Sequence, residues 1–215
     1  ITVAQGTYTE AIDFDGKNLT VTGGDPTDPA VVAATILNGG GDGGGTSATA
    51  VTFESSETAQ AVLTGLTITT NFGRGVYCSS ASPTISYCQI INNMSYAGGG
   101  FYLSQSNAAI LHCLIRDNMT GMDGGGAVYS VAGSPSVQNC TVVDNDCGAG
   151  GAYCGGIGVS SGSIAISGCI LWANTFNGSV PEQLAVGNVA AGEPRVQWGS
   201  RDCRAGYACA YLEVA

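Results

Sequence analysis

The chain has 215 residues, of which 34 are Gly and 44% are hydrophobic, and its formal net charge is −10. This length and hydrophobic content fit one folded domain and exclude a disordered chain. Six Lys and Arg stand against 16 Asp and Glu, and no apolar run approaches 18 residues, so we expect neither nucleic-acid binding nor a membrane span.

Residues 1–65 are predicted to form irregular coils of short strands. The strands are expected at Ile1–Val3, Ala11–Phe14, Leu19–Thr22, Thr35–Asn38, Val51–Phe53 and Ala61–Leu63. Residues 23–29 are rich in Gly, Asp and Pro, which predicts a turn-rich excursion. The Gly39–Gly45 run lacks the Lys of a phosphate-binding loop and is predicted to be a flexible loop.

One pattern recurs five times between residues 66 and 174, and successive copies are 22, 25, 27 and 29 residues apart. A Cys or Leu is followed two residues later by an aliphatic residue and three further on by Asn. The copies are Leu66-Ile68-Asn71, Cys88-Ile90-Asn93, Cys113-Ile115-Asn118, Cys140-Val142-Asn145 and Cys169-Leu171-Asn174. A repeat of this length indicates a solenoid.

Alternating apolar and small polar residues within each copy indicate strands, and no helical period is present. The sequence therefore predicts an all-β fold, a right-handed single-stranded parallel β-helix of about six or seven coils with about three strands per coil. A second column of Tyr77, Tyr102, Tyr129 and Tyr153 runs beside the first. The variable Asn-to-Tyr spacing predicts a loop that is free to change.

Stacked coils would place equivalent residues above one another. Cys88, Cys113, Cys140 and Cys169 would then form a file of small buried thiols. The asparagines Asn71, Asn93, Asn118, Asn145 and Asn174 would form a ladder of amide hydrogen bonds in a tight turn. We expect three regions in one domain: irregular coils over 1–65, regular repeats over 66–174, and a C-terminal coil, cap or exchange segment over 175–215.

Several runs resemble right-handed β-helix repeats. They are Gly98-Gly99-Gly100-Phe101-Tyr102, Ser82-Pro83-Thr84-Ile85-Ser86-Tyr87-Cys88-Gln89-Ile90-Ile91-Asn92-Asn93 and Ser134-Pro135-Ser136-Val137-Gln138-Asn139-Cys140. They are similar to repeats of secreted bacterial proteins in the pectate-lyase-like superfamily and of polymorphic outer-membrane adhesins, with Ile or Val in place of the Phe of the adhesin repeat. Lyases of this superfamily use a Lys or Arg base and often Ca2+ held by carboxylates. No coil of this chain carries the corresponding Asp and Arg cluster, so those roles do not transfer.

The cysteines outside the file suggest disulfides. Cys203 and Cys209 are the first candidate pair, and Cys147 and Cys154 are the second. Cys78 and Cys154 are expected to share a column three coils apart, too far to bond. No Cys-x-x-Cys pair exists, and with His112 as the single histidine a zinc site is not expected.

Asp117 and Asp144 share a column and are the best enzymatic candidates. Two stacked carboxylates can share a proton or meet the spacing of a retaining glycosidase. With Asp123 and Asp146 they are also weak candidates for Ca2+. The alternative is that these residues are solvent-facing turn residues, and otherwise no cofactor is expected.

A possible contact surface combines residues of the variable loops with residues of the terminal strand. Its members are Met94, Tyr96, Met119, Met122, Tyr211 and Leu212. The sequence favours an exported, non-enzymatic structural or adhesive β-helix protein, extracellular or at the cell surface. Its expected partners are copies of itself, with assembly into a filament or surface layer, or other surface proteins and glycans. The alternative is a polysaccharide lyase or glycoside hydrolase of the same fold.

Overall fold

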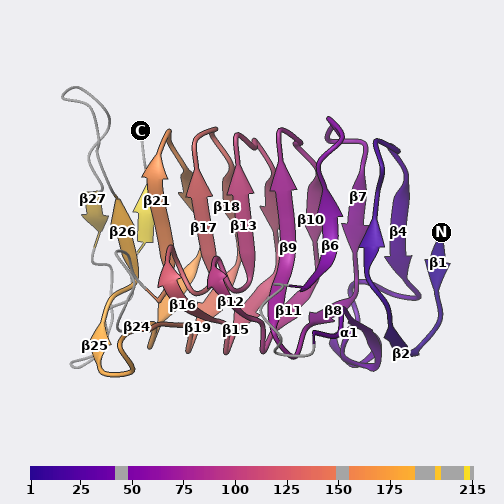
Figure 1. Cartoon of the computed structure of the whole chain (residues 1–215), viewed down its shortest axis with the longest axis horizontal. Coiled ribbons are helices and arrows are strands. Elements are labelled where there is room, and N and C mark those ends of the chain that lie inside the picture. The colour runs from indigo at the N-terminus through magenta and orange to yellow at the C-terminus, as the bar shows by residue number, and fades with distance from the viewer. Residues whose placement is uncertain (42–47, 149–154, 187–196, 200–210, 214–215) are drawn as a thin grey trace.

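The computed structural model describes residues 1–41, 48–148, 155–186, 197–199 and 211–213. Within these residues the chain winds as a parallel β-solenoid of about six turns (Figure 1), which confirms the predicted fold class. The described residues contain one short helix, α1 (Pro29–Ala34). The segment predicted as a turn excursion thus leads into a helix, which begins because the Asp28 side chain accepts a hydrogen bond from the Ala30 N–H and Pro29 occupies the first turn.

Three sheets run along the solenoid and hold seven strands each. Sheet A contains β1 (Thr2–Val3), β4 (Thr20–Gly23), β7 (Val62–Thr64), β10 (Thr84–Ser86), β14 (Ala109–Leu111), β18 (Ser136–Gln138) and β22 (Ala165–Ser167). Sheet B contains β2 (Gly6–Thr9), β5 (Thr35–Asn38), β8 (Thr67–Thr69), β11 (Gln89–Ile91), β15 (Leu114–Arg116), β19 (Thr141–Val143) and β23 (Ile170–Trp172). Sheet C contains β3 (Ile12–Asp13), β6 (Ala48–Phe53), β9 (Gly73–Ser79), β13 (Phe101–Ser104), β17 (Val128–Val131), β21 (Ile157–Ser161) and β26 (Leu184–Val186).

A fourth sheet, D, adds a strand to the later coils, where three strands per coil were expected. It contains β12 (Met94–Ala97), β16 (Met119–Asp123), β20 (Asp146–Cys147), β24 (Thr175–Phe176) and β25 (Val180–Pro181). β25 pairs antiparallel with β24. A further antiparallel pair joins β27 (Gln197–Gly199) to β28 (Tyr211–Glu213), and β28 contacts β22 of sheet A.

Two left-handed residues per coil make the corners around sheet B. Between sheets A and B, Tyr87, His112 and Asn139 have φ of 52°, 53° and 53°. Between sheets B and D, Asn92, Asp117 and Asp144 have φ of 55°, 54° and 54°. A single left-handed residue reverses the side-chain alternation and turns the chain, and Asn and Asp adopt this conformation at lower cost than most residues.

The core is a set of vertical files of buried side chains. Ile68, Ile90, Ile115, Val142 and Leu171 occupy equivalent positions in sheet B, and all are at most 2% exposed. Cys88, Cys113, Cys140 and Cys169 form the neighbouring file as buried thiols outside any disulfide. The backbone N–H of Cys113 donates to the Cys140 Sγ at 3.4 Å, and the backbone N–H of Cys140 donates to the Cys169 Sγ, also at 3.4 Å.

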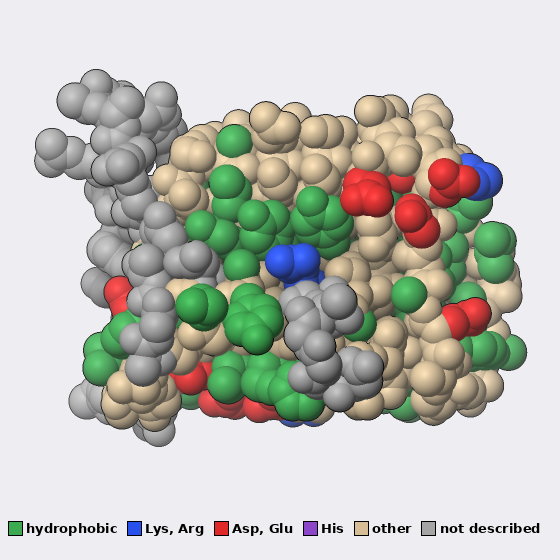
Figure 2. Space-filling view, viewed as in Figure 1, with side chains coloured by type: hydrophobic (Ala, Val, Ile, Leu, Met, Phe, Trp, Pro, Cys, Tyr) green, Lys and Arg blue, Asp and Glu red, His purple; other side chains and the backbone are tan. Residues whose placement is uncertain are grey.

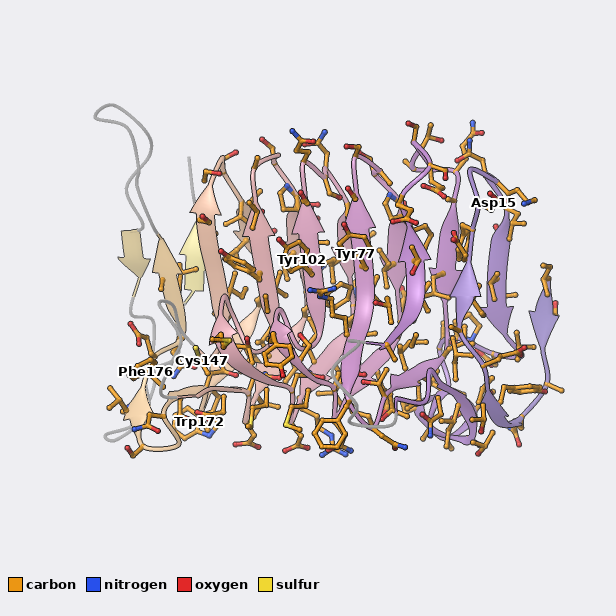
Figure 3. All side chains as sticks on the ribbon, viewed as in Figure 1. Asp15, Tyr77, Tyr102, Cys147, Trp172 and Phe176 are labelled. Carbon is orange, nitrogen blue, oxygen red and sulfur yellow. The ribbon has the colours of Figure 1, made fainter. Side chains whose placement is uncertain are left out.

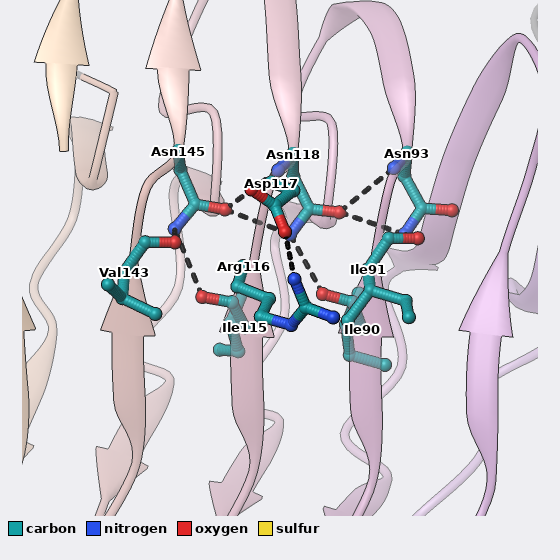
Figure 4. A network of polar contacts seen from close by, with 9 residues as sticks. All are labelled: Ile90, Ile91, Asn93, Ile115, Arg116, Asp117, Asn118, Val143 and Asn145. Atoms are coloured by element: carbon teal, nitrogen blue, oxygen red, sulfur yellow. Dashed lines mark hydrogen bonds and ion pairs between the residues drawn. The ribbon is translucent and has the colours of Figure 1, made fainter. Parts of the chain in front are cut away.

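A buried ladder of side-chain amides runs parallel to the thiol file (Figure 4). The Nδ2 groups of Asn93, Asn118 and Asn145 each donate to the Oδ1 of the asparagine in the next coil, at 2.9, 2.9 and 2.8 Å. The same Oδ1 atoms accept the backbone N–H groups of these three asparagines, at 3.0 to 3.1 Å. Each amide therefore crosslinks two coils inside the core, where polar groups must be paired.

The ladder begins and ends differently from the prediction. Asn71 is exposed and lies outside it. Thr70 takes the first place, buried at 3%, with its Oγ1 3.1 Å from the Asn93 Oδ1. At the other end the Asn174 Nδ2 donates to the Gln183 Oε1 at 2.7 Å. The prediction for Asn71 was wrong because this coil lacks the left-handed residue that precedes each ladder asparagine in the later coils, so the ladder position comes one residue earlier.

Asn118→Ala is expected to lower the free energy of unfolding by at least about 3 kcal/mol. The substitution removes the donor to the Asn145 Oδ1 and to the Ile90 carbonyl, and it removes the acceptor of two Asn93 N–H groups. Each buried group left unpaired costs about 1–3 kcal/mol. Urea denaturation measures the loss, and Asn71→Ala is the control, expected to change stability by less than about 0.5 kcal/mol. Equal losses in the two variants would contradict the ladder.

Stability is also expected to fall as the pH rises from 8 to 10. Burial raises the pKa of the Cys78 thiol, and burial likewise raises the pKa of Cys113 well above its ordinary value. Thiols of the unfolded chain ionise at about pH 8.5, so above that pH the unfolded chain binds fewer protons than the folded chain. The free energy of unfolding therefore falls by up to about 1.4 kcal/mol per pH unit for each such thiol. Urea midpoints under reducing conditions measure the slope. Cys78→Ala should make it shallower, and an unchanged slope in that variant would contradict this reading.

Candidate functional site

A row of tyrosines lies on the outer face of sheet C. Tyr77, Tyr102 and Tyr129 are register partners in β9, β13 and β17. Their ring centroids are 5.6 Å apart for Tyr77 and Tyr102 and 5.5 Å apart for Tyr102 and Tyr129. The residues on either side of each, such as Phe101 and Leu103, are buried in the core, so the three rings lie on the opposite face of the sheet. Tyr77 and Tyr102 are partly exposed, whereas Tyr129 is only 7% exposed. Figure 3 shows the first two on neighbouring strands.

The row does not extend to the fourth predicted tyrosine. Gly158 of β21 is the register partner of Tyr129, and Tyr153 lies outside the described residues. The column of Cys78 likewise continues through Leu103 and Ser130 to Val159, so the expectation that Cys154 shares it was wrong. The segment before β21 is longer than in earlier coils, and counting residues from the glycines misplaced both positions.

Arg74 lies across this row. Its Cζ is 4.8 Å from the centroid of Tyr102 and 5.5 Å from that of Tyr77, within the range of cation–π interactions. Its Nε donates to the Ala97 carbonyl at 3.1 Å, which fixes the plane of the guanidinium. Figure 2 shows Arg and hydrophobic side chains together on this face.

Arg74 differs from the other described cations in its partners. Lys17 pairs with Asp15, and Arg116 pairs with Asp117. Among the Lys and Arg residues within the described ranges, Arg74 alone has no described carboxylate within salt-bridge distance. Its terminal N–H groups are therefore suited to an acceptor on a ligand.

The four loop residues of the predicted contact surface come together on sheet D. Met94 and Met119 are direct register partners in β12 and β16. Tyr96 is 58% exposed, Met119 37% and Met122 55%, and Met94 is half-buried. Tyr211 and Leu212 lie in β28, which contacts sheet A, and their side chains lie outside the description. The structure thus separates the terminal strand from the rest of the predicted surface.

The candidate carboxylates lie at or next to the corner between sheets B and D. Asp117 and Asp144 are exposed, and Asp117 pairs with the neighbouring Arg116 (Figure 4). The Asp146 Oδ1 accepts hydrogen bonds from the Thr175 Oγ1 and the Gly178 N–H at 2.7 and 2.8 Å, so this carboxylate holds a turn. The Asp123 side chain is not described. Across the described residues, no group of three His, Cys, Asp or Glu side chains is placed to hold a metal ion.

The predicted disulfides fall mainly beyond the described ranges. Cys203, Cys209 and Cys154 lie outside them, and Cys147 is buried in β20 between Thr120 and Phe176 of the adjacent coils. His112 is exposed and stacks on Tyr87, with ring centroids 4.9 Å apart, at the corner between sheets A and B. This pair lies at a different part of each coil from the sheet C row.

Comparison with known proteins assigns the family. The model of the family described as "Right handed beta helix region" matches residues 35–180. The chain belongs to the right-handed β-helix family. No curated protein and no solved structure matches the chain. In the part of the chain that is described, no helix is both long and apolar enough to cross a membrane.

Sequence reasoning found the tyrosine column but not its association with Arg74. The available signal was the position of Arg74 three residues before Tyr77. Strand alternation does not show how a long side chain bends, so the contact with Tyr102 of the next coil required coordinates.

Arg74 and Tyr102 are expected to be energetically coupled. A double-mutant cycle of Arg74→Gln and Tyr102→Leu should give an interaction energy of about 0.5–1 kcal/mol in urea denaturation, because the cation–π contact exists only when both are present. The control cycle pairs Arg74→Gln with Tyr87→Leu, at another corner of the solenoid, and should be additive. Additivity in both cycles would show that the contact contributes nothing.

Proposed function

We propose that the protein is an exported, non-enzymatic adhesive module that binds a neutral glycan along the outer face of sheet C. The observation that carries the proposal is the partly exposed pair of Tyr77 and Tyr102 with Arg74 across it. A solenoid suits this role because columns of buried side chains hold its strands in place. The side chains on the outer face of these strands are therefore preorganised for binding.

The chemistry of the row fits a sugar chain. Tyrosine presents a flat apolar ring and a hydroxyl, so it can cover the C–H face of a sugar and bond its hydroxyl groups. Guanidinium N–H groups donate to sugar oxygens. Tyr77 and Tyr102 lie one coil apart, so they can contact successive units of a linear ligand.

The charge of the chain favours a neutral ligand over a polyanion. With 16 Asp and Glu against 6 Lys and Arg, the protein repels extended negative chains. Arg74 can donate to a local acceptor, but one cation does not offset a net charge of −10.

Glycan-array screening followed by calorimetry tests the proposal. We expect binding to neutral oligosaccharides, with Tyr102→Ala and Arg74→Gln each weakening it at least about tenfold, or 1.4 kcal/mol. Tyr87→Ala is the matched control because Tyr87 is also exposed and ring-stacked but lies at another corner. Binding that is absent, or equally affected by the control variant, would refute the proposal.

The same glycans distinguish binding from cleavage. The enzymatic alternative assigns catalysis to Asp117 and Asp144, and it requires new reducing ends or unsaturated products after incubation. We expect no such products. Products formed by the native protein and lost in Asp144→Asn would establish the alternative and overturn the non-enzymatic assignment.

A further inference from the structure

All three methionines of the chain lie on two neighbouring strands. The sequence contains three Met in 215 residues, at positions 94, 119 and 122. Met94 belongs to β12 and the other two to β16, the adjacent strand of sheet D. Met94 and Met119 are direct register partners, so their Cα atoms are separated by about the 4.8 Å between paired strands.

An irregularity in β16 brings the third methionine to the same face. Thr120 is fully buried and faces the core, and Met119 faces outward, so regular alternation would turn Met122 inward. Ser95 pairs with Thr120, and Ala97 pairs with Asp123. Between these two pairs β16 therefore contains one residue more than β12. The extra residue keeps Met122 on the outside, at 55% exposure.

The space between the methionines is open. Gly121 lies between Met119 and Met122, and a Cβ built there would meet only the Ser95 carbonyl oxygen, at 3.8 Å. Unbranched, half-exposed methionine side chains can turn into this space. A methionine side chain that turns over Gly121 therefore meets little of the described backbone there.

We infer that Met94, Met119 and Met122 form a binding site for a soft monovalent metal ion, with Cu(I) as the natural candidate. Thioether sulfur is a neutral, soft ligand that selects Cu(I) over hard divalent ions. The net charge of −10 favours a cation at the surface. The ion binds and leaves as Cu(I), so no oxidation or reduction of the protein takes part.

Silver(I), which has the same charge and softness and no redox chemistry under these conditions, is the direct probe. Selectively labelled methionine methyl groups give three resonances, one for each methionine, which report coordination at sulfur independently of the cysteines. Accessible thiols are first blocked with N-ethylmaleimide. We expect the three resonances to shift together and to saturate at one equivalent of silver, and Cu(I) added without oxygen to compete for the same site.

Leucine substitutions separate a metal site from an apolar contact surface. Met119→Leu keeps the size and apolar character of the side chain but removes the sulfur, so silver affinity at the remaining two methionines should fall at least tenfold. Tyr102→Ala, which tests the glycan proposal, should leave silver binding unchanged. Resonances that do not shift, that shift at different silver concentrations, or that respond equally in Met119→Leu would overturn the inference.

Discussion

The in-register stacking of one coil on the next is the constraint on which the rest of the structure depends. Parallel pairing in sheets A, B and C places each residue over its equivalent, so a residue type that suits one coil suits its neighbours. The asparagine ladder is the strictest case, because each buried amide donates to the amide of the next coil and to a carbonyl of the coil before it. A shift of one residue would leave several such groups unpaired at once.

The same stacking produces the functional surfaces. Tyr77, Tyr102 and the buried Tyr129 form a row because equivalent positions of sheet C repeat coil by coil, and Arg74 reaches from one coil to the ring of the next. Sheet D, which starts at β12, adds a second face where Met94 and Met119 meet. The sheet C row suits a repeating ligand, whereas the methionine cluster is local and depends on an irregularity in one strand. The two proposed activities therefore rest on separate residues of one scaffold.

Much of the fold follows from the sequence, because buried files require similar residues at regular intervals. The thiol file and the central ladder asparagines were predicted from spacing alone, and the structure has them at equivalent positions. The corner before each cysteine was harder to recognise: Tyr87, His112, Asn139 and Gly168 share no side-chain chemistry, but all have positive φ. The common requirement lies in the backbone, which residue types report only weakly.

Other predictions failed where the repeat changes length. Thr70 replaces Asn71 at the start of the ladder, and Gly158 stands where Tyr153 was expected. The arcs before the tyrosines were expected to be loops free to change, yet Gly99 packs so closely that a Cβ would lie 2.5 Å from the Met119 carbonyl oxygen. Spacing shows that an arc varies, but it does not show whether its backbone is packed.

Nuclear Overhauser effects between the side-chain amides of Asn93, Asn118 and Asn145 test the central claim most directly. In-register stacking predicts contacts between each amide and the next in the file, with exchange of these amide protons slowed by burial. Amides that exchange as fast as those of the exposed Asn71 and show no contacts between successive asparagines would contradict the stacked arrangement.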